Sequence, residues 1–236
     1  MGRLIILTGA GLSAESGLRT FRDSNGLWEN HSIDEVCNGA TWRKNHELVQ
    51  KFYNDRRTQL GTAEPNAAHR MIAEWQRRYD TVILTQNVDD LLERAGCGEV
   101  VHLHGFLPEM QCVDCGHIWS IGYEAWKTGA SCANCPSIKG VRPNIVFFGE
   151  MAPMYEIMWG ELSAMTARDV FLVIGTSGVV LPVAQMAAQL GGCKILNNLA
   201  PESAIDDRAF THAIYKPATQ AVGSIDRILQ EHLPGS

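Results

Sequence analysis

The stretch "LTGAGLSAESGLRTFRDSNGLW", residues 7–28, decides the fold. Residues 4–7 are apolar, a Gly-x-Gly turn follows at 9–11, and a helical pattern starts after it. A buried strand, a glycine turn and a helix start can bring backbone amides and the positive end of a helix close to a phosphate. The helical pattern stops early, at Gly17, where an ordinary dinucleotide-binding unit would continue into a second strand that ends in an acidic residue. The segment therefore predicts a cofactor-binding loop of unusual form.

Composition and charge are those of an ordinary globular protein. The 236 residues are 45% hydrophobic and 19% charged, with a formal net charge of -6. An acidic balance argues against broad nucleic-acid binding, which needs a basic face. No apolar run reaches the roughly 18 residues of a membrane span, and the run near the start is too short for a signal peptide. We expect a cytoplasmic protein that binds neither membranes nor nucleic acid directly.

Short apolar runs alternate with helical patterns along the chain. The runs show no polar alternation, as expected for strands that are covered on both faces. Expected strands are residues 4–8, 81–85, 144–148, 170–175 and 194–197. Expected helices are residues 41–60, 65–78, 154–166, 181–190 and 219–233. This order predicts an α/β fold with a Rossmann-like, doubly wound parallel sheet.

Four of the seven cysteines form two C-x2-C pairs that are separated by 16 residues, within a segment that breaks the alternation. Four thiolates at this spacing can surround Zn²⁺ tetrahedrally with no position left for water, which is typical of a structural site. Two redox pairs are the alternative, but neither pair follows a strand and opens a helix. We expect residues 109–143 to form a small zinc-ribbon module inserted into a nucleotide-binding domain of residues 1–108 and 144–236. The expected ligands are Cys112, Cys115, Cys132 and Cys135.

Polar segments follow three of the expected strands: "TQNVD" at 85–89, "IGTSG" at 174–178 and "LNNLAP" at 196–201. Ligands of parallel sheets bind at the carboxyl ends of the strands. Each segment alone is an ordinary turn, but together with the glycine turn they favour a binding site.

Several segments resemble the sirtuin family of NAD-dependent protein lysine deacylases. They are "GAGLSAESGLRTFR", "TQNVDDL", "HLHG", the two cysteine pairs, "FFGE" and "GTSGVVLP", in the family's order and spacing. Nearly the whole chain takes part. The resemblance implies that the first helix is followed by a loop that covers the cofactor, which accounts for the truncated dinucleotide pattern.

The resemblance also implies which residues bind NAD. Phe21 and Arg22 would cover the nicotinamide ribose, while Asn87 and Asp89 would hold the nicotinamide and its ribose. The full set of expected cofactor-binding residues is Gly9, Ala10, Gly11, Ser13, Glu15, Phe21, Arg22, Trp28, Gln86, Asn87, Val88, Asp89, Gly175, Thr176, Ser177, Asn198, Leu199 and Ala218.

The implied reaction releases nicotinamide, free lysine and O-acyl-ADP-ribose. By resemblance, His104 is the general base that deprotonates a ribose hydroxyl, assisted by Asn87, and a group that titrates near neutrality suits this role. His102 and His104 alternate along an extended segment and should face opposite sides. We expect His102 to be structural, because only His104 precedes a glycine that leaves room for a ligand.

One helical pattern bears on the acyl group. Val49, Tyr53, Arg56 and Leu60 are spaced to share one stripe of a helix, from which Arg57 should point away. A structural ion pair, or an apolar stem that carries the charged group out to water, would also explain Arg56. The Tyr-x-x-Arg pattern, however, resembles the sirtuin branch that removes succinyl, malonyl and glutaryl groups, in which these two side chains bind the acyl carboxylate. That branch usually has alanine where this chain has Cys37.

The expected substrates are therefore proteins or peptides that carry succinyl-, malonyl- or acetyl-lysine. Expected substrate-binding residues are Tyr53, Arg56, Val146, Phe147, Phe148 and Gly149. Three other classes stay open at this point: a protein mono-ADP-ribosyltransferase that uses the same NAD site, a nicotinamide-dependent dehydrogenase, and a non-enzymatic zinc-ribbon interaction protein.

Overall fold

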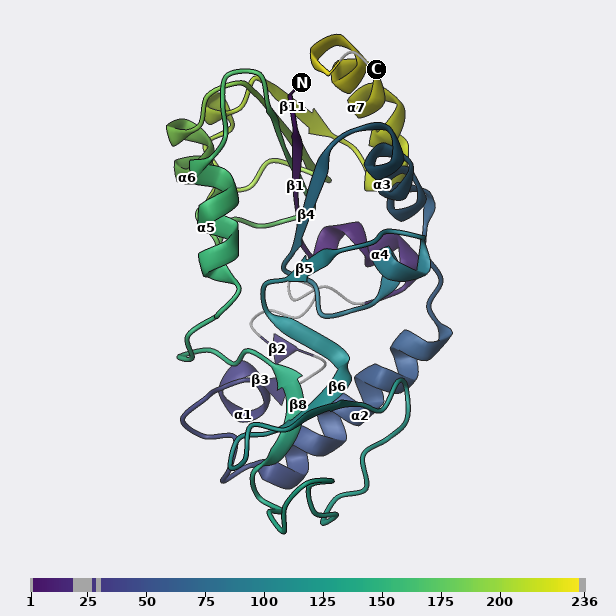
Figure 1. Cartoon of the computed structure of the whole chain (residues 1–236), viewed down its shortest axis with the longest axis vertical. Helices are drawn as coiled ribbons and strands as arrows, with labels where there is room; N and C mark the ends of the chain where they lie inside the picture. The colour runs from purple at the N-terminus through teal and green to yellow at the C-terminus, as the bar shows by residue number, and fades with distance from the viewer. Residues whose placement is uncertain (1, 19–26, 29–30, 234–236) are drawn as a thin grey trace.

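A six-stranded, wholly parallel sheet forms the centre of the molecule. The computed structural model describes residues 2–18, 27–28 and 31–233 (Figure 1). The strand order is β11-β10-β9-β1-β4-β5. In this order the strands are β11 (His212–Tyr215), β10 (Cys193–Asn198), β9 (Val170–Ile174), β1 (Leu4–Thr8), β4 (Thr81–Thr85) and β5 (Val100–His102). The chain winds outward from β1 in both directions, so the expected doubly wound Rossmann-like fold is confirmed, with its switch point between β1 and β9.

Helices cover both faces of this sheet (Figure 1). Helices α3 (Ala67–Arg78) and α7 (Ala218–His232) cover one face, and α5 (Tyr155–Ser163) and α6 (Val183–Gln189) cover the other. Side chains of β1 alternate between the two cores, and every residue of β1 and β9 is buried. Strands buried on both faces need apolar residues at every position, which explains why these runs were recognisable from the sequence.

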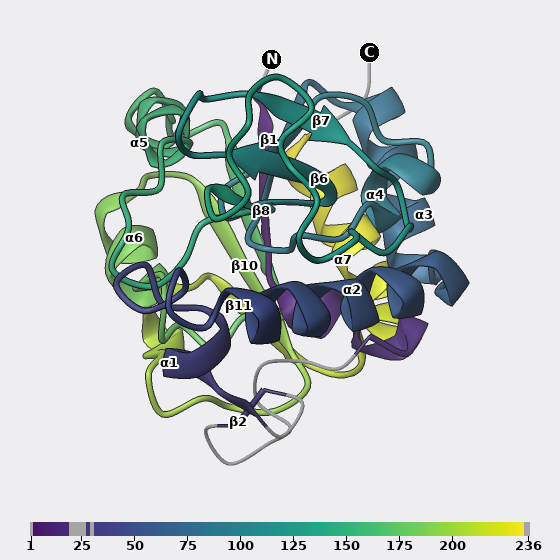
Figure 2. The same cartoon turned by 90° about the horizontal axis from the view of Figure 1, so that it is seen from below.

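A second layer packs below the carboxyl edge of the large sheet. It contains an antiparallel sheet of β7 (Ile118–Ser120), β6 (Gly105–Cys112) and β8 (Val141–Ile145), with α1 (Ile33–Val36) and α2 (His46–Thr62). Figure 2 shows α2 lying beside the small sheet. The two share an apolar core that includes Tyr53, Leu107 and Ile145. The division of the chain at residues 109 and 143 stays a prediction, and the structure adds α1 and α2 to the elements around the cysteine segment.

Short elements complete the described part of the chain. They are the 3-10 turns η1 (Ala10–Leu12), η2 (Ala14–Ser16) and η3 (Asp207–Ala209), the helix α4 (Leu91–Arg94), and the paired strands β2 (Leu27–Trp28) and β3 (His31–Ser32). Among the described residues, no helix combines the length and the apolar character needed to cross a membrane.

One expected strand was wrong. Residues 144–148 were predicted to lie in the large parallel sheet, but the strand ends at Ile145 and pairs antiparallel with β6. Its apolar run is buried by α2 and the small sheet, and burial of this kind has the same sequence pattern as burial in a parallel sheet. Strands β5 and β11, at the two edges of the large sheet, are short and only partly buried, and they were missed.

Candidate functional site

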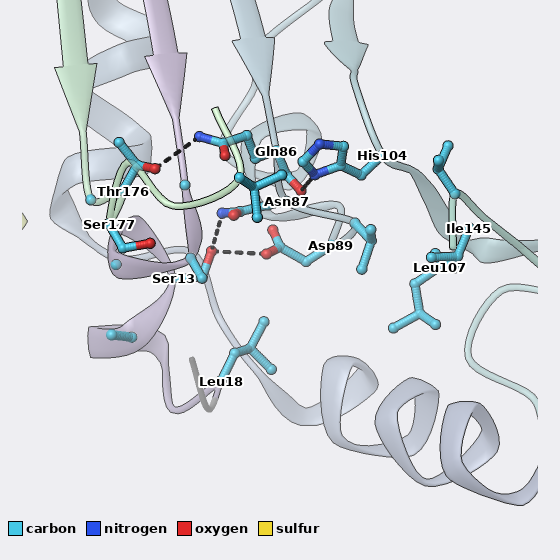
Figure 3. A pocket seen from close by; sticks show the side chains of 18 of the residues that line it. Ser13, Leu18, Gln86, Asn87, Asp89, His104, Leu107, Ile145, Thr176 and Ser177 are labelled. Carbon is cyan, nitrogen blue, oxygen red and sulfur yellow. Dashed lines mark hydrogen bonds between the residues drawn. The ribbon is translucent and has the colours of Figure 1, made fainter. Parts of the chain in front are cut away.

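A cleft of about 1180 Å³ lies between the carboxyl edge of the large sheet and the second layer. Loops that follow β1, β4, β9 and β10 line one side of it, and residues 145–153 line the other (Figure 3). The expected cofactor residues whose side chains are described all line this cleft. Expected residues Phe21 and Arg22, and the side chain of Trp28, lie outside the described residues.

The glycine turn after β1 packs directly on the loop after β9. A Cβ atom on Gly9 would lie 2.7 Å from the Gly175 carbonyl oxygen, and one on Gly11 would lie 2.7 Å from the Gly175 Cα. The Gly9 amide donates to Ile174 O at 2.9 Å, and the Gly11 amide donates to Gly175 O at 2.8 Å. The expectation that these two amides are available to a pyrophosphate was therefore wrong. The glycines bring the two loops together, and within the described residues up to 18 they are followed by 3-10 turns.

Ser13 joins the turn after β1 to the loop after β4. Its hydroxyl donates to Asp89 Oδ2 at 2.9 Å and accepts from Asn87 Nδ2 at 3.1 Å (Figure 3). His69 Nε2 lies 3.3 Å from the same hydroxyl. Burial raises the pKa of Asp89, although the Ser13 hydrogen bond partly opposes this. A carboxylate and an amide are thus held side by side in the cleft, positioned to bind hydroxyl and carboxamide groups.

A second polar group lies beside the first, at the ends of β9 and β10. The side-chain amide of Asn198 closes two hydrogen bonds with the backbone of Thr176, which donates to Oδ1 at 3.1 Å and accepts from Nδ2 at 2.9 Å. Gln86 Nε2 donates to the Thr176 hydroxyl at 3.1 Å. At the start of α7, Glu15 accepts hydrogen bonds from the Thr219 amide and hydroxyl. These contacts fix loops that are far apart in sequence around one end of the cleft.

His104 lines the cleft between the two layers. Its Nδ1 lies 3.0 Å from Gln86 O, and its Nε2 lies 2.8 Å from the Tyr155 hydroxyl. A carbonyl can only accept, so Nδ1 carries the proton and Nε2 is the basic nitrogen. Burial lowers the pKa of His104, which favours the neutral imidazole that a general base requires.

His104 lines the cleft, and His102 is not among the lining residues. The argument that alternation separates the two histidines was wrong, because residues two apart in an extended segment share a face, and β5 already ends at His102. His102 Nε2 lies 2.7 Å from Glu93 Oε1, and its Nδ1 contacts Asn87 O at 3.0 Å. Burial acts to lower the pKa of His102, but the hydrogen bond and charge of Glu93 outweigh burial and raise it. His102 is thus engaged in a structural contact. The expectation that Gly105 leaves room for a ligand beside His104 was wrong. Gly105 has φ +90, and a Cβ atom on it would lie 2.2 Å from Asn144 O, so the missing side chain makes room for the backbone of β8.

The far end of the cleft is lined by Cys37, Arg56 and Phe147. Tyr53 does not line it: this residue is fully buried behind the wall, stacked on Phe147 with ring centroids 5.8 Å apart. The Tyr53 hydroxyl shares a hydrogen bond with the Cys37 thiol, and the charge of Arg56 acts on it. Burial raises the pKa of Tyr53 well above its ordinary value, so the hydroxyl stays protonated.

The predicted orientation of Arg57 was wrong. This side chain is fully buried and donates to Leu107 O at 2.9 Å, Asn54 Oδ1 at 2.9 Å and Met110 Sδ at 2.7 Å. Burial lowers the pKa of Arg57 to about 10. The small sheet also covers the side of α2 that carries His46, Gln50 and Arg57, which lies next to the expected stripe. The two neighbouring arginines therefore both point inward, to different surroundings.

The segment expected to contact a substrate peptide is partly paired already. The amides of Val146 and Phe148 donate to His104 O and Cys37 O, and the Phe147 amide donates to Glu150 Oε2 at 2.9 Å. Glu150 also forms a bidentate ion pair with the buried Arg142, at 2.7 and 2.9 Å. The segment is therefore rigidly held, and it presents Phe148 to the cleft with a partly exposed ring.

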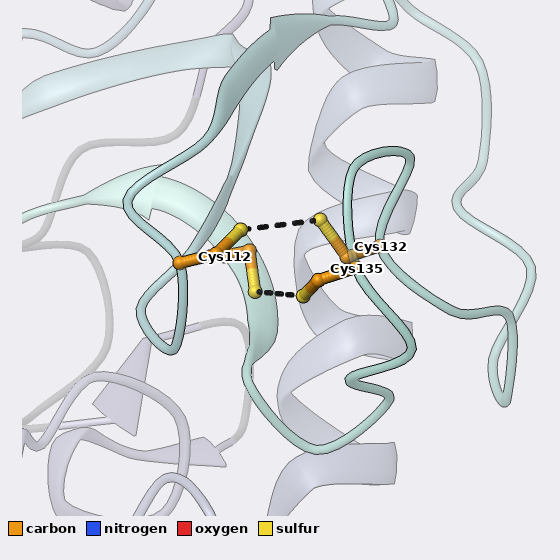
Figure 4. A group of neighbouring side chains, drawn as sticks. Cys112, Cys132 and Cys135 are labelled. Atoms are coloured by element: carbon orange, nitrogen blue, oxygen red, sulfur yellow. Dashed lines mark hydrogen bonds between the residues drawn. The ribbon is translucent and has the colours of Figure 1, made fainter.

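The four paired cysteines meet in the second layer (Figure 4). Cys112 Sγ lies 3.7 Å from Cys135 Sγ, and Cys115 Sγ lies 3.7 Å from Cys132 Sγ. Zinc–sulfur bonds of about 2.3 Å give tetrahedral edges of about 3.8 Å, so the thiol positions fit a Zn²⁺ ion. Four sulfur ligands leave no position for water, and the site is structural.

Some residues of the cleft were not anticipated from the sequence. Tyr155, which contacts His104, lies 51 residues further along the chain at the start of α5. Lys216, Asn197, Glu202 and Met151 also line the cleft. Asn197 lies in a segment that was already singled out, but the others lie outside any motif, and no spacing rule connects them to the site.

The sheet order, the glycine turn at the switch point, the polar cleft and the four-thiol module define a nucleotide-binding α/β protein with a structural zinc site. The family model of the Sir2 family matches residues 9–182. The chain therefore belongs to the Sir2 family.

Curated relatives and a solved structure are similar to this protein over most of its chain. The NAD-dependent protein deacylase of Campylobacter jejuni subsp. jejuni is 50% identical over 190 residues, covering 80% of this chain and 79% of that protein. The NAD-dependent protein deacylase of Helicobacter hepaticus is 43% identical over 254 residues, covering 98% of each chain. Among solved structures, a Sir2 homolog–NAD complex has a TM-score of 0.85 and 34% identity, covering 97% of this chain and 90% of the other.

Proposed function

We propose that this Sir2-family protein, an NAD-dependent protein deacylase, removes succinyl and malonyl groups from lysine side chains as well as acetyl groups. The observation that carries the acyl preference is that Arg56 lines the cleft, whose lining also includes Cys37 and Phe147. A planar guanidinium can bind a carboxylate through two parallel hydrogen bonds. An acetyl group offers no carboxylate for this contact, and a succinyl group does.

The cleft residues divide the work of the reaction. NAD supplies a sugar carbon open to attack and nicotinamide as the leaving group. Asn87 and Asp89, joined through Ser13, are positioned to hold the nicotinamide end. The neutral imidazole of His104 accepts a proton from a ribose hydroxyl at Nε2, while Gln86 O keeps the proton on Nδ1. The hydroxyl of Tyr155 must leave Nε2 for this step to occur.

The Arg56 proposal is tested with paired substrates. A hydrogen bond between charged groups contributes roughly 1.5–3 kcal/mol, or about 10- to 150-fold in kcat/KM. Arg56→Met should lower kcat/KM for a succinyl-lysine peptide by that factor and leave kcat/KM for the matched acetyl-lysine peptide nearly unchanged. Arg56→Lys should recover only part of the loss, because an ammonium cannot reproduce the bidentate contact.

A matched control is Arg227→Met, an exposed arginine of α7 outside the cleft, which should affect neither substrate. Product masses should show free lysine and O-acyl-ADP-ribose, whereas an ADP-ribosyltransferase would leave ADP-ribose on the peptide. Equal loss of both activities in Arg56→Met would assign Arg56 to the structure of the wall and refute the acyl preference.

We also propose that the protein works in the reducing cytoplasm. All seven cysteines are free thiols, including the four that fit zinc. Disulfides are rare in that compartment, where thiols stay reduced and can bind metal. Fractionation of cells, with the zinc content of the purified protein measured, tests this assignment; recovery from an oxidising compartment would contradict it.

A further inference from the structure

Three residues at the edge of the large sheet remote from the cleft bring their side chains together. Cys193 begins β10, His212 begins β11, and His232 ends α7. One ligand atom from each residue lies within 4.8 Å of those of the other two. Figure 1 shows β11 and the end of α7 in this region, far from the second layer. A thiol and two imidazoles from three separate elements make a set of donors suited to a metal ion.

The register of the sheet and the packing of α7 explain why Cys193, His212 and His232 lie together. His212 pairs with Ile195, and Cys193 lies two residues before Ile195. The side chains of Cys193, Ile195 and His212 therefore point to the same face of the sheet. That face is covered by α7, whose Ile225 belongs to the same apolar core as Cys193. The last residue of the helix thereby reaches over the two strand starts. The cluster is thus built by the pairing and packing of the fold.

One hydrogen bond prepares His232 to bind a metal. Its Nδ1 lies 3.0 Å from the carbonyl of Ile228, one turn earlier in α7. The carbonyl fixes the proton on Nδ1 and leaves the lone pair on Nε2, the arrangement that metal-binding histidines commonly show. The His232 ring lies nearly perpendicular to that of His212, at 79° with centroids 6.2 Å apart. Cys193 is buried, and His232 is exposed, so solvent reaches the site from one side.

We propose that Cys193, His212 and His232 form a second metal site, for Zn²⁺ or a similar late first-row divalent cation. One thiolate and two imidazoles suit such ions, and the hard cations Mg²⁺ and Ca²⁺ prefer oxygen. A water molecule from the open side completes four-fold coordination, and the thiol proton is released to solvent on binding. Tetrahedral ligands lie about 3.3–3.6 Å apart, so a small rotation of the exposed His232 side chain closes the site.

The proposed metal site lies apart from the cofactor cleft and would act on the stability of the fold. At about 3.3 Å per residue, β10 separates Cys193 from Asn198 in the cleft by roughly 16 Å, so the metal takes no part in the reaction. Helix α7 begins at Ala218, which lines the cleft, and ends at His232. A metal that joins the end of the helix to β10 and β11 stabilises the folded state by binding to it alone.

The experiment uses the full chain already loaded with one Zn²⁺ in the four-cysteine site. Titration with further Zn²⁺ against a chromophoric chelator should show a second equivalent bound with a Kd of about 1 μM or tighter, and Mg²⁺ should not compete. His232→Gln, at an exposed helix end, should fold normally and weaken the second site by more than about 100-fold. The second equivalent should also raise the Tm of the wild type and leave that of His232→Gln unchanged.

His31→Gln and Cys97→Ser are matched controls, a histidine and a buried cysteine outside both clusters, and each should keep the second equivalent. A cobalt-loaded second site should show a thiolate-to-metal absorption band that Cys193→Ser removes. The proposal is overturned by a wild-type protein that binds one Zn²⁺ only, or by a second equivalent that binds equally well to His232→Gln. Neither result bears on deacylation, which the Arg56 variants test separately.

Discussion

Replacing Tyr155 by Phe tests how the fold prepares His104, the proposed general base. The Tyr155 hydroxyl donates to His104 Nε2 at 2.8 Å, and burial raises the pKa of Tyr155, so this donor stays protonated at neutral pH. A donor at Nε2 stabilises the neutral imidazole and adds to the effect of burial, which lowers the pKa of His104. Tyr155→Phe removes this contribution and keeps the ring.

The size of the effect follows from one hydrogen bond. A net contribution of about 0.5–1.5 kcal/mol corresponds to a rise of about 0.4–1.1 in the pKa of His104. The base must be neutral, so the rate falls as the pH drops through this pKa. The acid limb of kcat/KM for the peptide, which at saturating NAD reports the enzyme–NAD complex, should therefore move to higher pH by that amount. Well above the pKa, the variant should equal or exceed the wild type, because Nε2 is no longer occupied.

The assay is the pH profile of kcat/KM for an acetyl-lysine peptide at saturating NAD, from pH 5 to 9. Tyr215→Phe is a matched control. The Tyr215 hydroxyl donates to Asp207 Oδ2 at 2.7 Å, and neither residue lines the cleft. An unshifted acid limb in Tyr155→Phe would show that the Tyr155 contact does not act on His104 in the working enzyme. A uniform loss at every pH would instead place Tyr155 in the chemistry.

Four further predictions test the base, the pH stability, the ion pair and the zinc module. His104→Ala should abolish deacylation of every acyl-lysine peptide with the Tm nearly unchanged, and substantial residual turnover would remove His104 from the mechanism. Burial lowers the pKa of His69 to about 4, so as the pH drops from about 6.5 to about 4 the unfolded chain protonates this histidine while the folded chain does not, and stability falls. Over this range the free energy of unfolding in urea should fall by up to about 3 kcal/mol more in the wild type than in His69→Gln. Equal losses in the two proteins would contradict this effect of His69. Arg142→Leu leaves the Glu150 carboxylate without its bidentate partner and should cost about 3–5 kcal/mol of unfolding free energy, measured in urea; a loss below about 1 kcal/mol would contradict this. Cys132→Ser should lower both the bound zinc and the yield of folded protein, since zinc binding and folding are linked, and a variant as stable as the wild type would refute a structural role.

The sequence was sufficient for the large sheet and much of the cleft, for a physical reason. Buried parallel strands leave uninterrupted apolar runs, and the residues that follow them must gather at one edge. The loops holding Gly9, Gln86 and Thr176 could therefore be placed together before any contact was known. Paired cysteines likewise predict their own meeting, because a metal ion requires all four ligands at once.

The rest depended on contacts that no local pattern encodes. Tyr155 reaches His104 only because residues 149–153 lead from the second layer back to α5, and no periodicity records this path. The pairing of β8 with β6 was misread for a related reason, since an apolar run reveals that a strand is buried but not which sheet buries it. Likewise, the amides of Gly9 and Gly11 bond to a loop that arrives more than 160 residues later.

The pair Arg56 and Arg57 shows where the helical stripe rule stops being sufficient. The rule assumes that one face of a helix is buried, and on that assumption one of two adjacent arginines must point to solvent. Helix α2 is instead buried on two sides, by the wall of the cleft and by the small sheet. Arg57 holds Leu107 O, and the Leu107 amide in turn donates to Val88 O at 2.8 Å, next to Asn87. One guanidinium thus ties α2 and β6 to the loop that carries Asn87, while its neighbour lines the cleft. The two substitutions should have different effects: Arg57→Met should lower stability and every activity together, and Arg56→Met should change acyl preference alone.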